Sequence, residues 1–235
     1  MSTTSDHPEE YRQFRFERPP GSTELLLIRH GESEPARRDR QFPLVDGHSD
    51  PELAPEGREQ ARRVADRLSF AKIDHIYVTT LRRTVQTAAP LAERLGITPV
   101  VEPGLREVLL GDWEGGIFRH KVAENGEIAQ RLWREGRWDV IPGAEPAEEF
   151  AARVRAAIER LAAAHRDQTI AVFTHGGVIG QVLATATNAR SFAFVGADNG
   201  SISHLVIVPD VWIVRRFNDT AHLDPAFTLV PAPLT

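Results

Sequence analysis

The chain of 235 residues has no cysteine, no long apolar run and only two lysines, Lys72 and Lys121. The lack of cysteine excludes disulfides, thiolate metal sites and cysteine nucleophiles. No apolar stretch reaches the roughly 18 residues that a membrane-spanning helix needs, and the polar segment 1–22 has no apolar signal core. We therefore expect a cytoplasmic protein without a membrane partner, with a poorly ordered extension over residues 1–22.

Other absences narrow the class of function. The net charge of −5 at pH 7 disfavours nucleic acid as a partner. The chain has no HExxH or comparable spacing of metal ligands and no GxxxxGK[ST] phosphate loop. We therefore expect no metal, no cofactor and no nucleotide hydrolysis by that route. The length fits one domain, or at most two small ones, and we expect a single domain at residues 23–235. It leaves both a monomer and a homodimer open.

Short apolar strands alternate with amphipathic helices along most of the chain. This alternation predicts an α/β fold, a three-layer α/β/α sandwich with a mainly parallel central sheet and a C-terminal antiparallel hairpin. The predicted strands cover about 23–30, 75–79, 100–101 and 169–174, the helices about 55–68, 146–165 and 176–187, and the hairpin 201–208 and 211–217.

Two segments depart from this regular pattern. The helix that starts near Arg82 contains Pro90, which is expected to kink or break it. Residues 108–144 are rich in glycine and aromatic residues, which suggests a cap-like insertion over a site with one short helix. A long surface excursion with its own small hydrophobic cluster is the alternative for this segment. The predicted apolar face of the helix near Arg82 consists of Val85, Ala88, Ala89, Ala92 and Leu95.

Polar residues follow three of the predicted strands. Arg29-His30-Gly31 ends the first, Arg82-Arg83 follows the second, and His175-Gly176-Gly177 follows the strand 169–174. In open α/β sheets, ligands bind outside the carboxyl ends of the strands. Cations, glycines and free helix N-terminal amides at that edge indicate an anion site, most simply for phosphate. A charged turn after a core strand is the plainer explanation of each junction taken alone.

Four stretches carry these residues and their neighbours: LIRHGES at 27–33, TTLRRTVQTA at 79–88, LRE at 105–107 with GDWEG at 111–115, and FTHGG at 173–177. Together and in this order they resemble the histidine phosphatase superfamily, in the branch that includes cofactor-dependent phosphoglycerate mutases and related phosphatases. The resemblance extends over roughly residues 23–222.

The resemblance implies roles for five residues. His30 matches the nucleophile that becomes phosphorylated, and nearby arginines would lower its pKa and keep it neutral. Arg29 and Arg83 match the guanidinium groups that bind phosphate. His175 matches a second histidine that donates to the phosphoryl group, and Glu107 matches the proton donor to the leaving oxygen and then the base that activates water. No metal is needed in this scheme.

Each of these residues has a structural alternative. Glu107 could be a surface carboxylate at a strand end, Arg83 a solvated helix residue, and His175 a side chain that caps its helix. The GDWEG stretch after Glu107 and the paired glycines after His175 favour the catalytic interpretation.

Substrate contacts are less clearly marked. The run Arg119-His120-Lys121 favours an anionic group distal to the phosphate, such as a carboxylate or a second phosphate, although a solvated charge run explains it equally well. Many relatives carry an asparagine six residues after the nucleophile, where this chain has Ala36, so one phosphate contact is either missing or supplied by another loop. The candidate substrate contacts are Ser33, His48, Arg119, His120 and Gly176.

Three functions fit these residues. The first is a phosphomonoester hydrolase for a small phosphorylated metabolite, in which water attacks phosphorylated His30 with Glu107 as base. The second is a phosphoglycerate-type mutase, which returns the phosphoryl group to another hydroxyl of the substrate and must exclude water. The third is a non-catalytic phosphate-binding module. The GDWEG stretch resembles the phosphatases more than the mutases.

Overall fold

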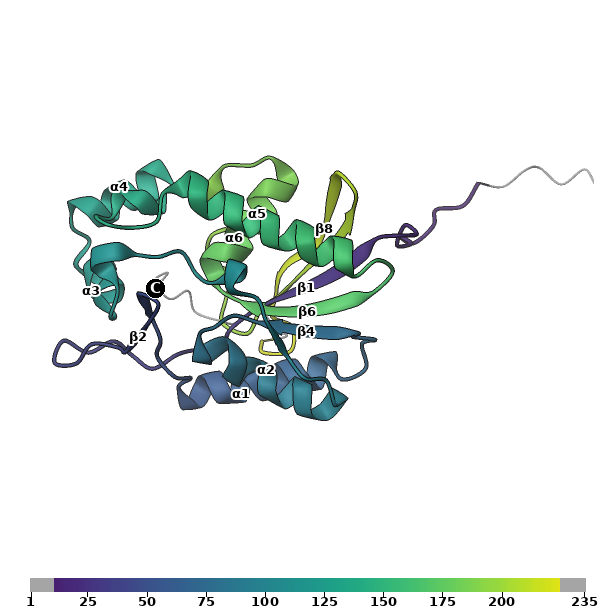
Figure 1. The fold of residues 1–235 in the computed structure, drawn as a ribbon, viewed down its shortest axis with the longest axis horizontal. Coiled ribbons are helices and arrows are strands. Elements are labelled where there is room, and N and C mark those ends of the chain that lie inside the picture. The colour runs from purple at the N-terminus through teal and green to yellow at the C-terminus, as the bar shows by residue number, and fades with distance from the viewer. Residues whose placement is uncertain (1–10, 225–235) are drawn as a thin grey trace, which may run out of the picture.

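A mixed six-stranded sheet forms the centre of the computed structural model, which describes residues 11–224 (Figure 1). The strand order is β5-β4-β6-β1-β7-β8. The first four strands are parallel, and β7 and β8 are antiparallel to their neighbours, so the predicted sheet and C-terminal hairpin are confirmed. The strands are β1 (Thr23–Arg29), β4 (His75–Val78), β5 (Val100–Val101), β6 (Thr169–Thr174), β7 (Ile202–Val208) and β8 (Val211–Asp219).

Helices cover both faces of this sheet (Figure 1). One pair, α1 and α2, packs on one face, and α5 and α6 pack on the other. A separate two-stranded ribbon, β2 with β3, lies outside the main sheet. The helices are α1 (Pro55–Leu68), α2 (Arg82–Leu95), α5 (Ala147–Ala164) and α6 (Gly176–Thr187), and the ribbon strands are β2 (Leu44–Val45) and β3 (His48–Ser49).

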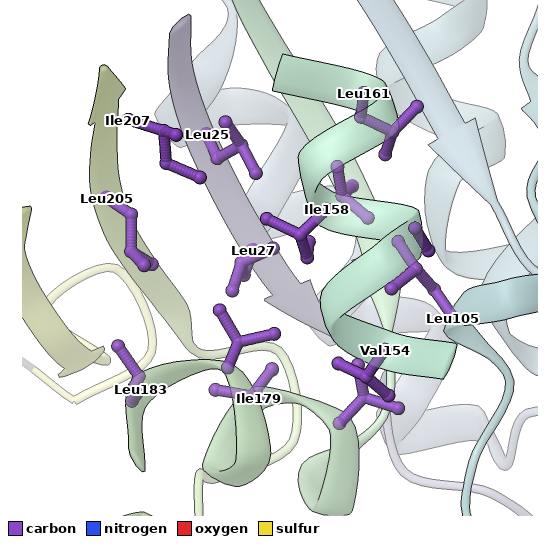
Figure 2. Close-up of a cluster of buried hydrophobic side chains, with 14 of the residues drawn as sticks. Leu25, Leu27, Leu105, Val154, Ile158, Leu161, Ile179, Leu183, Leu205 and Ile207 are labelled. Atoms are coloured by element: carbon purple, nitrogen blue, oxygen red, sulfur yellow. The ribbon is translucent and has the colours of Figure 1, made fainter. Parts of the chain in front are cut away.

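The apolar run of β1 is continuous because the strand is covered on both faces. Leu25 and Leu27 belong to the cluster under α5 and α6, which Figure 2 shows. Leu26 and Ile28 pack into the cluster under α1 and α2. Successive side chains of a strand point to opposite faces, so each of the two cores receives every second residue. Burial of each such side chain stabilises the folded state by roughly 1.5–3 kcal/mol. Because a shift of one residue would turn every side chain to the opposite face, this burial fixes the register of β1 and the position of the residues that follow it.

Helix α2 differs from the sequence prediction in two ways. It continues through Pro90 to Leu95 without a break. The predicted face was right for Ala88 and Ala92 and wrong for Val85 and Ala89, which are exposed. Polar residues with partners inside the protein, Arg83 and Thr87, occupy the buried face instead.

The segment 108–144 contains two short helices, where the sequence suggested one. They are α3 (Ile117–Glu124) and α4 (Glu127–Glu135), which lie together at one end of the molecule (Figure 1). The segment has its own hydrophobic cluster around the buried residues Trp113, Leu132 and Ile141, and Leu110 and Trp138 connect it to the core under α5 and α6.

Residues 1–10 of the predicted N-terminal extension lie outside the described residues. Nearer the sheet, Arg18 donates to the carbonyl of Asp167, the amide of Gly21 donates to the Asp167 carboxylate, and Ser22 is fully buried. Over residues 11–224, the model contains no helix that is both long and apolar enough to cross a membrane.

Candidate active site

The two histidines named from the sequence lie side by side at one edge of the sheet. β1 and β6 are neighbouring parallel strands, and Arg29 pairs with Thr174 in their register. The next residue on each strand is therefore His30 and His175, whose ring centroids are 5.2 Å apart. Both side chains are buried, at 7% and 0% exposure. The register of the two central strands thus builds the pair.

A single backbone contact sets the proton arrangement of His30. Its Nδ1 lies 2.8 Å from the carbonyl oxygen of Gly31, which can only accept a hydrogen bond. The neutral ring therefore carries its proton on Nδ1, and the lone pair on Nε2 is available to an electrophile. Burial, followed by the charges of Arg83 and Arg29, holds the pKa of His30 well below its ordinary value of 6.5. The His30 imidazole is therefore neutral at physiological pH.

Two guanidinium groups flank His30 and line the same cavity. Arg29 donates from Nη1 to the carbonyl of Ala197, and Arg83 donates from Nη1 to the carbonyl of Ser49 over 2.7 Å. Burial lowers the pKa of Arg83 to about 10, so this side chain stays charged at neutral pH. Arg82, by contrast, points to the carboxylates of Asp50 and Glu52 and does not line the cavity.

Glu107 reaches the same cavity from the loop after β5. Its carboxylate accepts hydrogen bonds from the amides of Val108 at 3.0 Å and Gly177 at 3.1 Å. A Cβ atom at position 177 would lie 2.4 Å from a Glu107 oxygen, so this close approach requires glycine. The second glycine of the FTHGG stretch therefore gives the carboxylate its place beside the N-terminus of α6.

His175 is held by a hydroxyl that the sequence analysis did not single out. Its Nε2 lies 3.0 Å from Oγ1 of Thr79, which in turn contacts Oγ1 of Thr84 at 3.0 Å. Among the described residues, the buried Nδ1 has no hydrogen-bond partner. Burial and the charge of Arg83 lower the pKa of His175 well below 6.5. A ligand oxygen is the natural partner for the unsatisfied Nδ1.

A third guanidinium joins the cavity from α3. Arg119 donates to Oγ of Ser33 over 2.6 Å and to the carbonyl of Glu34 over 2.7 Å. Its charge lowers the pKa values of His30 and of the two flanking arginines. We refer to Arg29, His30, Arg83, Arg119 and His175 as the cationic cluster, since the three arginines dominate its charge.

The other candidate contacts divide into two groups. Ser33, His48 and Gly176 line the cavity together with Arg29, His30, Arg83 and Arg119, and His175 lies buried directly behind His30. His120 does not, because successive helix positions are about 100° apart and Arg119 takes the inward direction. Ala36 lies against Gly116 at the start of α3 rather than in the cavity.

Much of the remaining cavity lining is aromatic, and sequence analysis placed four of these side chains only in a general cap and did not consider Phe42. Ring contacts connect several of them, with centroids of Trp113 and Phe118 6.1 Å apart and those of Phe118 and Trp138 also 6.1 Å apart. No single spacing rule in the sequence identifies them as one surface. We call the set the aromatic wall, which consists of Phe42, Trp113, Phe118, Trp133 and Trp138.

Within residues 11–224, no group of three or more histidine, aspartate or glutamate side chains is arranged to hold a metal ion.

Comparison with known proteins places this site in a family. Residues 25–220 match the model of the histidine phosphatase superfamily, branch 1. The phosphoglycerate mutase-like protein 4 of Arabidopsis thaliana is 34% identical over 206 residues, which cover 86% of this chain and 87% of that protein. Phosphoserine phosphatase 1 of Hydrogenobacter thermophilus is 28% identical, over 85% of this chain and 93% of the relative.

A solved structure gives the same result. The mycobacterial glucosyl-3-phosphoglycerate phosphatase matches with a TM-score of 0.70 and 28% identity, covering 85% of this chain and 100% of that one. Phosphatases and mutases thus both occur among the relatives. The chain belongs to the histidine phosphatase superfamily, branch 1, whose members resemble phosphoglycerate mutase.

Proposed function

We propose that this protein is a metal-independent phosphomonoester hydrolase that acts on a small phosphorylated metabolite through a phosphohistidine on His30. The observation that carries the proposal is the state of that ring. Its Nδ1 is committed to the carbonyl of Gly31, and no hydrogen bond among the described residues engages Nε2. A neutral, buried imidazole nitrogen beside three arginines is a nucleophile for phosphorus.

The cationic cluster binds the phosphate group in this proposal. Arg29, Arg83 and Arg119 supply three positive charges, and a phosphomonoester dianion partly neutralises them. The amide groups at the N-terminus of α6 add the positive end of the helix dipole. Arg119 takes over the phosphate contact that the asparagine makes in many relatives, where this chain has Ala36.

In the first chemical step, Nε2 of His30 attacks phosphorus and the bond between phosphorus and the leaving oxygen breaks. Glu107 in its protonated form gives its proton to that oxygen, and the alcohol departs. His175 donates from Nδ1 to a phosphoryl oxygen, which stabilises the charge that develops on it, while Thr79 occupies Nε2. The step leaves a phosphohistidine and a Glu107 carboxylate.

In the second step, water attacks phosphorus and the phosphorus–nitrogen bond breaks. The Glu107 carboxylate removes a proton from that water, so inorganic phosphate forms and His30 and Glu107 return to their starting states. The backbone amides of Val108 and Gly177 hold the carboxylate in position for both transfers.

The test is hydrolysis of para-nitrophenyl phosphate in a buffer that contains a chelator, with the native chain and His30→Ala. We expect chelator-resistant turnover, and a loss of at least about 1,000-fold in kcat for His30→Ala because the nucleophile is absent. Turnover that survives this substitution would refute the assignment of the nucleophile.

A mutase is the second candidate, because the Arabidopsis relative is named for phosphoglycerate mutase. It predicts no hydrolysis by the native chain alone and phosphoryl transfer after addition of a bisphosphorylated primer. Phosphate binding without turnover under either condition would instead indicate a binding module.

A further inference from the structure

The aromatic wall offers a continuous apolar surface beside the cationic cluster. Trp133 and Trp138 both pack against Phe192, with ring centroids 5.9 and 4.7 Å from it. Phe192 thereby supports the wall from a segment outside 108–144, at residues 191–194. Phe118 and Trp133 remain partly exposed and line the cavity, so their faces are available to a ligand.

The same region offers no unpaired cation for a second anionic group. Within 108–144, every cation except Arg119 forms an ion pair with a carboxylate, and none of these paired cations lines the cavity. Arg119 itself is directed to Ser33 and Glu34, at the loop that follows the nucleophile. The paired cations are Lys121, Arg131, Arg134 and Arg137.

A fixed negative charge lies in this part of the cavity. The carboxylate of Glu114 lines it and accepts hydrogen bonds from the amide of Leu110 at 2.9 Å, from the amide of Ser49 at 2.7 Å and from the Ser49 hydroxyl. Three donors hold the carboxylate in place, so it would repel a carboxylate or second phosphate on the substrate.

We propose that the aromatic wall is the leaving-group subsite and that the substrate is a phosphomonoester of an alcohol with a flat apolar group and no second anionic group. The proposal rests on the hydrolase function argued above. It replaces the expectation, drawn from Arg119-His120-Lys121, of a distal anionic group. Flat rings bury a large apolar area against tryptophan and phenylalanine at low cost in conformational freedom.

Three phosphomonoesters of primary alcohols test the proposal, because their leaving oxygens have similar intrinsic reactivity. They are ethyl phosphate, 2-phenylethyl phosphate and 3-(phosphonooxy)propanoate, which carries a carboxylate in place of the ring. We expect kcat/KM for the phenyl ester to exceed that of ethyl phosphate by roughly 10- to 100-fold, since burial of a ring contributes that factor. The carboxylate ester should not exceed ethyl phosphate. Equal values for all three, or a preference for the carboxylate ester, would overturn the proposal.

Substitutions in the aromatic wall test whether its residues cause the preference for the phenyl ester. Phe118→Ala and Trp133→Ala should each lower kcat/KM for the phenyl ester by roughly 10-fold and leave ethyl phosphate nearly unchanged. Phe70→Ala is the matched control, since this phenylalanine is 96% exposed and does not line the cavity. A phenyl preference that persists undiminished in both wall variants would overturn the subsite assignment.

Binding of unreactive phosphonates separates this proposal from the proposed function. If neither para-nitrophenyl phosphate nor any of the three esters is hydrolysed, the hydrolase proposal fails, and calorimetry with 3-phenylpropylphosphonate and 4-phosphonobutanoate still tests the wall. Tighter binding of the phenyl compound, weakened by Phe118→Ala, supports the subsite. Tighter binding of the carboxylate compound refutes it.

Discussion

The cationic cluster and the aromatic wall meet at one cavity but are built in different ways. Three of the five residues of the cluster lie at the end of β1 or directly after β1 and β6, where register fixes their positions, and Arg83 is the second residue of α2. Four of the five residues of the wall come from the segment 108–144, which has its own hydrophobic cluster. Arg119 and Phe42 are the exceptions, and the Arg119 guanidinium lies 5.5 Å from the Phe42 ring centre.

We therefore assign the chemical steps to the cationic cluster and the selection of the substrate to the aromatic wall. In the proposed complex, the cluster contacts the phosphate group that every phosphomonoester shares, whereas the wall contacts the leaving group, which varies between them. Changes in the cluster should therefore alter kcat/KM by the same factor for all leaving groups, and changes in the wall by factors that depend on the leaving group.

The largest effect tests the cluster at Arg83. Arg83→Ala should lower kcat/KM by roughly 100- to 1,000-fold for ethyl phosphate and 2-phenylethyl phosphate alike, because the buried positive charge that binds the phosphate is lost. Arg83→Lys keeps the charge without the planar fork and should lose less. Losses that differ by more than about 3-fold between the two esters would mean that Arg83 also contacts the leaving group. The separate roles of the cationic cluster and the aromatic wall would then not hold for Arg83.

A smaller effect is expected for Gly177→Ala. The new methyl group would lie 2.4 Å from the Glu107 carboxylate and displace it. We expect kcat/KM to fall roughly 10- to 100-fold for 2-phenylethyl phosphate, which needs a proton on its leaving oxygen, and less for para-nitrophenyl phosphate, whose leaving group needs little help. Gly126→Ala is the control, since nothing lies within 4 Å of a Cβ atom at that position. Equal losses for both esters would argue against Glu107 as the proton donor.

The smallest effect concerns stability against pH. Both His30 and His175 have folded-state pKa values well below the unfolded value of 6.5, so the unfolded chain binds their protons first as the pH falls. Their contribution to stability is present above pH 6.5 and is lost as the pH falls below it. When the pH falls from 7.5 to 5.5, the free energy of unfolding measured in urea should therefore decrease in both the native chain and His175→Gln. The decrease in His175→Gln should be about 1 kcal/mol smaller than in the native chain. Phe118→Ala should show the native difference, and an unchanged pH dependence in His175→Gln would show that this histidine titrates normally.

Sequence reasoning was most successful where short-range patterns decide the structure. The apolar runs of β1 and β6 and the residues that follow them predicted which side chains meet at one edge of the sheet. The structure brings together His30, His175 and Glu107 from positions far apart in the chain. Parallel pairing of β6, which is buried throughout, with the largely buried β1 leaves few other registers, which is why this part could be predicted.

The remainder depended on packing that no local pattern encodes. Arg119 and His120 are adjacent, and only the orientation of α3 decides that the arginine faces the cavity. On α2, the buried contacts of Arg83 and Thr87 turned Val85 outward against its hydrophobicity. The aromatic wall gathers residues from three separate stretches, including Phe42, so its continuity exists only in three dimensions.

The hydrophobic cluster of residues 108–144 has an evolutionary consequence. Trp113, Leu132 and Ile141 pack together in this cluster, whereas Leu110 and Trp138 contact both this cluster and the core under α5 and α6. Phe118 and Trp133 pack against the cluster of the segment, so they can be exchanged without reaching the two cores that hold the strands in register. Selection for a new substrate can therefore act through substitutions in this segment. The same chemistry can serve many metabolites while the sheet, and with it the pair of histidines, stays unchanged.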